Sequence, residues 1–262
     1  METGDQVLDR VLAEPLLPTG IGPLDDLLEG GISRTMVTLL IGSAKVNAQI
    51  LQQFATLAAV RLCQANLTMQ KTILYIDGAN RFNPYEISRL SINQGVGAKE
   101  VLDAIMVSRA FSWSNMVQTV AENLENASAK QIDLLVVSGF TKYFEEMAQT
   151  PSTENSPPHL VMKPFEELGK MFAGLKRLQA KFNTRILLST VPHSKSLRSP
   201  AGGTKLKHFA NVILRMLPSP RGFTYYLDQH PFLPAKQITV NIPPTGLRDL
   251  THKTLDQFFL NK

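Results

Sequence analysis

Short apolar runs alternate with helical patterns along most of the chain. Five runs predict strands, at residues 36–41, 72–76, 104–110, 132–138 and 185–190. Between them, apolar residues recur at helical spacing at 48–64, 84–94, 114–128 and 165–182. The five runs are continuously apolar, which is typical of strands that are buried on both faces of a parallel sheet.

The pattern changes after residue 200. Three short runs, at 211–217, 223–229 and 236–242, lie close together there, with turn residues such as Pro218 and Gly222 between them. This spacing predicts antiparallel strands at one edge of the sheet. The sequence therefore predicts an α/β fold, a three-layer sandwich whose mostly parallel sheet ends in antiparallel C-terminal edge strands.

No linker divides the chain, so we expect one core domain over residues 17–262, preceded by an N-terminal arm over residues 1–16. Two polar segments, 148–160 and 192–206, are predicted to be mobile loops. Each follows the end of a predicted strand. Ligands of open α/β sheets bind at the carboxyl ends of the strands, so both loops are candidates for contact with a ligand.

Composition adds an asymmetry of charge to this pattern. The chain of 262 residues has a net charge of +5. From residue 181 onward, twelve Lys or Arg stand against three Asp, whereas the preceding part holds 15 basic and 19 acidic residues. The twelve are Lys181, Arg185, Lys195, Arg198, Lys205, Lys207, Arg215, Arg221, Lys236, Arg248, Lys253 and Lys262. The asymmetry favours an anionic partner, although a solvated basic face would have the same composition.

Cysteine content and the first residues bear on the compartment. Cys63 is the single cysteine, so we expect no internal disulfide and no cysteine-based zinc site, which fits a reducing compartment. The first residues lack a signal-peptide core, and no apolar stretch approaches the roughly 20 residues that span a bilayer. We expect a cytoplasmic protein, nucleoid-associated or, in a eukaryote, nuclear, with no membrane partner. The histidines show no metal-ligand spacing, so no metal site is predicted.

Six segments resemble, in the same order, parts of the RecA/RadA/KaiC-type ATPase core. They are LPTGIGPLDDLLEGGI at 17–32, ILYIDGANRFNPYEISRL at 73–90, VSRAFSWSNMVQTVAENL at 107–124, IDLLVVSGFTKYF at 132–144, LGKMFAGLKRLQAKFNTRILLSTV at 168–191 and QHPFLPAKQITV at 229–240. The resemblance covers about residues 17–242, nearly the whole chain. It implies a RecA-like fold of the P-loop NTPase type, whose active members bind ATP between subunits and hold single-stranded DNA with two loops.

The resemblance places the phosphate-binding loop at GSAKVNAQIL, residues 42–51. Gly42 matches the first glycine of G-x-x-x-x-G-K-[ST], but Asn47, Ala48 and Gln49 stand where glycine, lysine and serine or threonine belong. In the same alignment, the magnesium-side aspartate falls on Ser138. The catalytic glutamate falls on Ala79.

These replacements remove the groups that bind the phosphates and the metal and that activate water. The resemblance therefore implies a degenerate ATPase with no catalytic residue and no ATP or magnesium cofactor, in which the loop is kept for the turn between strand and helix. Lys45 is expected in that loop, where it could reach an anion, and Asp77 follows the second strand. These two residues leave an active NTPase with an atypical site as an alternative.

The second predicted loop supplies the candidate nucleic-acid surface. It corresponds to the second DNA-binding loop of RadA-like recombinases through His193, Lys195, Arg198, Gly202, Gly203, Lys205 and Lys207. The cations would neutralise phosphates and the glycines would let the backbone approach them, although a solvated loop would show the same residues. The first loop departs from the family because residues 148–159 include no basic or aromatic side chain.

Four further features have structural interpretations. Trp113 is expected in the core or at a helix start, with a partner contact as the alternative. Cys63 is expected to be a buried thiol, and Phe209 to belong to the core. The C-terminal segment 250–262 has a rough apolar helical face, formed by Leu250, Leu255, Phe258 and Phe259, that could dock on the core or on a neighbour.

Three functions are consistent with the sequence. The favoured one is a RadA/RecA-like pseudo-ATPase that binds DNA, more readily single-stranded than double-stranded, and assists recombinational DNA repair beside a recombinase or another RecA-like subunit. The second is a non-catalytic structural subunit of a RecA-like ring or hetero-complex, similar to the Elongator accessory ring. The third is the active NTPase with an atypical site.

Overall fold

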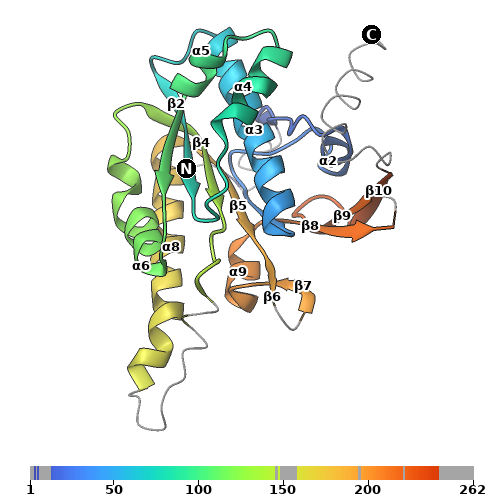
Figure 1. Cartoon of the computed structure of the whole chain (residues 1–262). Helices are drawn as coiled ribbons and strands as arrows, with labels where there is room; N and C mark the ends of the chain where they lie inside the picture. Colours follow the sequence, from blue (N-terminus) through green and yellow to red (C-terminus); the bar gives the residue numbers. More distant parts are fainter. Residues whose placement is uncertain are drawn as a thin grey trace.

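A mixed eight-stranded sheet forms the centre of the computed structural model, which describes residues 3, 5, 13–144, 147, 158–193, 196–220 and 222–241 (Figure 1). The order across the sheet is β10-β9-β8-β1-β5-β4-β2-β3. The strands are β1 (Val37–Ile41), β2 (Lys71–Asp77), β3 (Ile105–Arg109), β4 (Gln131–Ser138), β5 (Arg185–Thr190), β8 (Val212–Ser219), β9 (Gly222–Gln229) and β10 (Lys236–Asn241). Neighbours from β8 to β3 are parallel, whereas β9 and β10 are antiparallel at the edge, so the predicted sheet is confirmed.

Helices cover both faces of this sheet, as the continuous apolar strands predict. One face carries α2 (Gly22–Leu27), α3 (Ala44–Gln64), α4 (Pro84–Asn93) and α5 (Ala98–Asp103), and the other carries α6 (Trp113–Val117), the π-helix η1 (Gln118–Asn123), the 3-10 helix η2 (Leu124–Asn126), α8 (Pro158–Phe182) and α9 (Gly203–Phe209). Successive strand residues point to opposite faces. Ile73 and Tyr75 therefore pack beneath α3, while Leu74 and Ile76 pack on the side of α8.

Local structure differs from the prediction in four places. α3 begins at Ala44 rather than at residue 48, and the helix expected at 114–128 is divided among α6, η1 and η2. α8 begins at Pro158, inside the first expected loop, of which residues 148–157 lie outside the described part. The second expected loop contains the antiparallel strands β6 (Pro192–His193) and β7 (Ser196–Pro200) and the first turn of α9. Pairing of backbone groups in these elements replaces the irregular structure that polar composition suggested.

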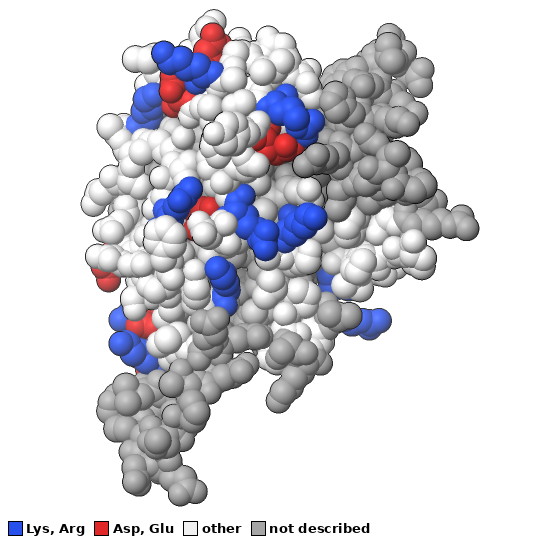
Figure 2. Space-filling model, viewed as in Figure 1, with Lys and Arg blue, Asp and Glu red and all other residues white. Residues whose placement is uncertain are grey.

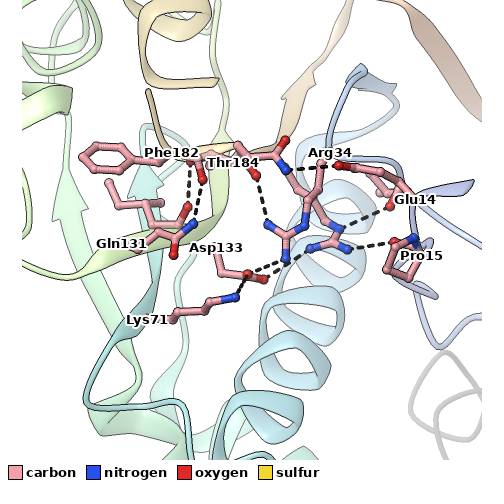
Figure 3. Close-up of polar contacts among 12 residues, drawn as sticks. Glu14, Pro15, Arg34, Lys71, Gln131, Asp133, Phe182 and Thr184 are labelled. Atoms are coloured by element: carbon pink, nitrogen blue, oxygen red, sulfur yellow. Dashed lines mark hydrogen bonds and ion pairs between the residues drawn. The ribbon is translucent and has the colours of Figure 1, made fainter. Parts of the chain in front are cut away.

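A buried carboxylate ties the amino ends of the central strands to the N-terminal arm (Figure 3). Asp133 of β4 accepts a hydrogen bond from Arg34 at 2.6 Å, and its carboxylate lies 3.5 Å from Lys71 Nζ and 3.4 Å from Arg185 Nη1. Arg185 also donates to the carbonyl oxygen of Pro15 at 2.9 Å. Burial, and then the positive charge of Arg34, lower the pKa of Arg185 to about 10. The cluster thus fixes the base of the sheet opposite the strand ends that form the candidate site.

Candidate functional site

The junction between β1 and α3 is a tight turn. Only Gly42 and Ser43 separate the two elements, and the Ser43 hydroxyl caps the helix by accepting a hydrogen bond from Val46 N at 3.4 Å. The helix therefore begins early, and Lys45 lies exposed in its first turn. The expectation that Lys45 sits in a retained loop is wrong, because the serine cap lets helical hydrogen bonding start at Ala44.

Asn47 occupies the space beneath this turn. Its Nδ2 donates to the carbonyl oxygens of Gly42 and Thr190, at 2.9 Å each, and the side chain is buried. An added Cβ at position 42 would lie 2.8 Å from Asn47 Oδ1 and 2.9 Å from Met216 Cε, so the ends of these two side chains would have to shift. Gly42 thus allows close packing around Asn47, which joins α3 to the end of β5.

A small cavity lies beside Asn47 at the carboxyl ends of β4 and β5. Its volume is ≈ 20 Å³, and its lining includes Asn47, Ala79 and Ser138, three of the positions at which the resemblance expects nucleotide-binding groups. Within the described part of the chain, the buried Asn47 Oδ1 and Ser138 Oγ have no hydrogen-bond partner. A cavity of this size holds about one water molecule, whereas ligand pockets measure about 300 Å³ or more.

The two remaining positions of the phosphate-binding motif lie on α3 itself. Ala48 is 3% exposed and packs in the core beneath the helix. Gln49 is partly buried, and its Oε1 finds no hydrogen-bond partner among the described residues. Neither residue supplies a positive charge or a hydroxyl group to the cavity.

Asp77 is buried and bound by backbone amide groups. It is 1% exposed, and its carboxylate accepts backbone N–H bonds from Arg81 at 2.9 and 3.1 Å and from Phe82 at 2.8 Å. These bonds hold the loop after β2. Because its oxygen atoms are engaged by the backbone, Asp77 orders this loop rather than presenting a free carboxylate to the cavity.

The candidate nucleic-acid residues lie on the β6–β7 hairpin and on α9, directly after β5. His193 belongs to β6, Arg198 is exposed on β7, and Lys205 is exposed on α9 with its Nζ 5.2 Å from the centroid of the Phe165 ring. Lys207 is partly buried on α9. Lys195 lies outside the described residues. The structure therefore brings Arg198, Lys205 and Lys207 onto adjoining elements at the carboxyl edge of the sheet.

The two glycines of this segment have different surroundings. Gly202 has a φ of +99° and is buried, and a Cβ there would lie 3.1 Å from Thr141 Cγ2. Gly203 has a φ of +64° and faces open space. Gly202 thus serves the turn that packs α9 against the strand ends, and only Gly203 leaves its backbone open to a ligand.

Part of the C-terminal positive charge is used inside the fold. Arg185 contacts Asp133, and Arg215 forms a bidentate pair with Asp228 at 2.6 and 2.9 Å. Lys236 contacts Glu29 at 3.0 Å. Arg221, Arg248, Lys253 and Lys262 lie outside the described residues, as does the C-terminal segment 250–262. The sequence count therefore overstates the charge that this third of the chain presents to a partner.

Three exposed cations at the carboxyl edge were missed from the sequence. Arg81 lies in the loop after β2, Arg109 is the last residue of β3, and Lys142 lies in the turn after β4. Figure 2 shows Lys and Arg side chains gathered across the middle of the face where these strands end in Figure 1. The available signal was position: each residue lies at or within five residues of the end of a predicted parallel strand.

Aromatic and sulfur side chains mostly serve packing. Trp113 is 3% exposed, donates from Nε1 to Glu167 at 2.6 Å and packs edge-on against Phe144, which confirms the structural interpretation. Phe209 is partly buried and stacks on Phe172 with ring centroids 4.1 Å apart. Cys63 is only partly buried, so the expectation of a buried thiol is wrong.

In the described part of the chain, no three His, Cys, Asp or Glu side chains are grouped so that they could hold a metal ion. No helix there is both long and apolar enough to cross a bilayer.

The chain is similar in sequence to known proteins over most of its length. A family model described as Rad51 matches residues 15–250. The chain is 24% identical to the DNA repair protein RAD51 of Mycosarcoma maydis over 247 residues, which cover 89% of this chain and 69% of that protein. It is 23% identical to the DNA repair and recombination protein RadB of Thermococcus sibiricus over 242 residues, which cover 90% of this chain and 96% of that protein.

Proposed function

This chain belongs to the Rad51 family and has a RecA-like fold, and from that premise we propose that it is a pseudo-ATPase paralogue that binds DNA and assists recombinational repair. The observation that carries the proposal is the group of cations on the β6–β7 hairpin and α9 beside a nucleotide position filled by Asn47. In this role the protein holds DNA, more readily single-stranded than double-stranded, for a catalytically active partner.

DNA binding is supported by the chemistry of the hairpin and α9. Arg198 and Lys205 are exposed, and neither forms an ion pair with a described acidic residue. Phosphate contacts by Arg and Lys supply most of the sequence-independent affinity of a protein for nucleic acid. These cations therefore have the exposure and charge that a backbone contact requires.

Loss of ATP hydrolysis is supported by the junction between β1 and α3. The first turn of α3 and the Asn47 side chain fill the volume in which a phosphate-binding loop would curve, and Ala48 places no cation there. A charge-assisted hydrogen bond contributes about 1.5–3 kcal/mol, so losing the lysine and the metal ligands together removes several such contributions to triphosphate affinity.

Fluorescence anisotropy with a labelled single-stranded oligonucleotide tests the DNA-binding part. We expect a Kd that rises steeply with salt, and a triple variant Arg198→Gln/Lys205→Gln/Lys207→Gln whose log–log salt slope is shallower by about 2, since each phosphate contact contributes about 0.7. The matched control Arg61→Gln/Lys99→Gln/Lys181→Gln removes the same charge at the amino edge of the sheet, where all three side chains are exposed. Equal effects of the two triple variants would reject the hairpin and α9 as the contact surface.

A phosphate-release assay with and without DNA tests the pseudo-ATPase part. We expect no release above background for the wild-type chain or for Lys45→Ala. Release that depends on Lys45 would instead establish an active site of atypical composition.

The proposal also includes a protein partner and a location near DNA. Family membership favours a partner that is itself a recombinase or another RecA-like subunit. It also favours a protein that is associated with the nucleoid or found in the nucleus. Light scattering after size-exclusion chromatography, with the purified chain and then with a co-purified partner, tests this. A stable closed ring that binds no DNA would favour a purely structural subunit.

A further inference from the structure

Four exposed cations form a row across the carboxyl edge of the parallel sheet. Lys45 follows β1, Lys142 follows β4, Arg81 follows β2 and Arg109 ends β3. The sheet order β1-β5-β4-β2-β3 sets them in that sequence across the edge. The hairpin and α9 follow β5 and so belong between Lys45 and Lys142. Residues from distant parts of the chain therefore share one surface.

Lys142 donates a hydrogen bond to Tyr143 OH at 3.2 Å, but intramolecular ion pairs do not account for the other three cations. Among the described residues, no acidic side chain forms an ion pair with Lys45, Arg81 or Arg109. Lys45 also lies in the first turn of the 21-residue helix α3, where the helix dipole disfavours a positive charge. A cation in that position is electrostatically unfavourable unless an anion comes close to it.

The side chains at the ends of β2 and β4 are buried or neutral. Asp77 lies opposite Arg109 in the pairing of β2 with β3, but its carboxylate is buried and accepts the backbone amides of Arg81 and Phe82. Ala79 and Ser138, which line the neighbouring cavity, are neutral. At these three described positions, an approaching phosphate chain would therefore meet no exposed carboxylate.

We propose that Lys45, Lys142, Arg81 and Arg109 form a phosphate-contact track for the backbone of a nucleic-acid strand, continuous with the hairpin and α9. The inference rests on the proposed DNA binding and extends it to a surface outside the predicted loops. Thr141, which precedes Lys142, contacts the turn that leads from β7 into α9: its Oγ1 donates to Ala201 O at 2.7 Å, and its methyl group lies against Gly202, the N-cap residue of α9.

The dimensions of the row suit a strand rather than a single small anion. Neighbouring strands lie about 4.8 Å apart, so the four steps from β1 to β3 span about 19 Å. A nucleic-acid strand advances about 3.4 Å per nucleotide in a duplex, so the row corresponds to about six nucleotides. Because the hairpin and α9 follow β5 and lie within this row, oligonucleotides long enough to cover the whole row should bind more tightly than those that cover only the hairpin and α9.

The test uses the full chain carrying Lys45→Gln/Arg81→Gln/Arg109→Gln, compared with the amino-edge control Arg61→Gln/Lys99→Gln/Lys181→Gln. Anisotropy is measured with single-stranded oligonucleotides of about 6 and about 20 nucleotides over a range of salt concentrations. We expect the track variant to bind the longer oligonucleotide about 10- to 100-fold more weakly near 0.1 M salt, with a salt slope shallower by about 2. We also expect its preference for the longer oligonucleotide to shrink, while the control keeps both properties.

The outcomes separate this inference from the proposed function. If the wild-type chain binds DNA and the track variant matches the control, the track is rejected while DNA binding by the hairpin and α9 stands. If the wild-type chain does not bind at low salt, both proposals fall. If the track variant keeps DNA affinity but loses binding of fluorescent ATP, the cations serve a free triphosphate, and the track is likewise rejected.

Folding of the track variant is checked by circular dichroism and thermal unfolding against the same control. Should the triple variant unfold, single variants at the three positions replace it, each with a charge-keeping partner: Lys45→Arg, Arg81→Lys or Arg109→Lys. We then expect each Gln variant to bind the longer oligonucleotide about fivefold more weakly and each charge-keeping variant to restore most of the affinity. Equal affinities within every pair would reject the track.

Discussion

Asn47 Nδ2 donates a hydrogen bond of 2.9 Å to the carbonyl oxygen of Thr190, a residue 143 positions away in sequence. This bond, with a second one to Gly42 O, closes the space between α3 and the end of β5. An amide in this position satisfies buried carbonyl groups that a bound phosphate could not satisfy, because both groups are acceptors. The contact makes the β1–α3 junction a packed structural element.

Replacing Asn47 tests that role. We expect Asn47→Ala to lower the free energy of unfolding by about 1–3 kcal/mol, because Gly42 O and Thr190 O each lose a buried amide donor, although Thr190 O keeps the bond from Gly42 N at 3.2 Å. Urea denaturation gives the measurement, and Asn93→Ala, at an exposed position on α4, serves as the matched control. A loss no larger than that of the control would mean that Asn47 does not stabilise the junction.

Restoring the missing lysine should damage the fold rather than revive nucleotide binding. Ala48 is buried under α3, so Ala48→Lys adds volume and a charge to the core. We expect a destabilisation of about 3 kcal/mol or more and no gain of ATP affinity. Thermal unfolding with and without Mg-ATP measures both, with the exposed Ala65→Lys as control. A stabilised variant in the presence of Mg-ATP would show that the site can reopen.

Substitution of Asp133 should destabilise the fold more than substitution of an exposed residue at the amino edge of the sheet. Asp133→Asn removes the carboxylate that faces Arg34, Lys71 and Arg185 and leaves their positive charges close together. Breaking a buried ion pair by removing one partner costs about 3–5 kcal/mol of unfolding free energy. Asp103→Asn, at an exposed position on α5, should change stability by less than about 0.5 kcal/mol in the same urea titration. Similar values for the two variants would contradict a central role for Asp133.

His230 should make stability depend on pH near neutrality. Its Nδ1 accepts backbone N–H bonds from Phe232 and Leu233 at 3.1 and 3.0 Å, which requires the neutral imidazole. Burial first, and then the charge of Lys236, lower the pKa of His230 from its ordinary value, while Glu29 acts in the opposite direction.

The sign of this dependence follows from the lowered pKa. As the pH falls below about 6.5, the unfolded chain takes up a proton before the folded chain does, so the unfolding free energy decreases. We expect His230→Gln to flatten this decrease and His208→Gln, at an exposed site on α9, to preserve it. Equilibrium denaturation at several pH values checks the pattern, and unchanged behaviour of His230→Gln would assign the dependence to another group.

The sequence by itself determined that helices cover both faces of the sheet, and it showed which residue types stand at the positions that the resemblance singles out. Runs such as 132–138 are apolar without alternation, and a strand with that pattern is stable only when both faces are covered. The resemblance placed Ala79 and Ser138 near the loop after β1, and both line the same cavity as Asn47. That these residue types make the site inactive stays a prediction.

Only the tertiary structure showed how the junction between β1 and α3 is packed and which cations lie at the same edge of the sheet. The start of α3 depends on the Ser43 cap and on the bond from Asn47 to Thr190, and neither is visible in periodicity. Arg81 and Arg109 lie in a part of the chain with more acidic than basic residues, yet the sheet order sets them beside the basic segment after β5. Periodicity records which face of its own element a residue occupies. Charge at an edge depends on contacts between elements that are far apart in sequence.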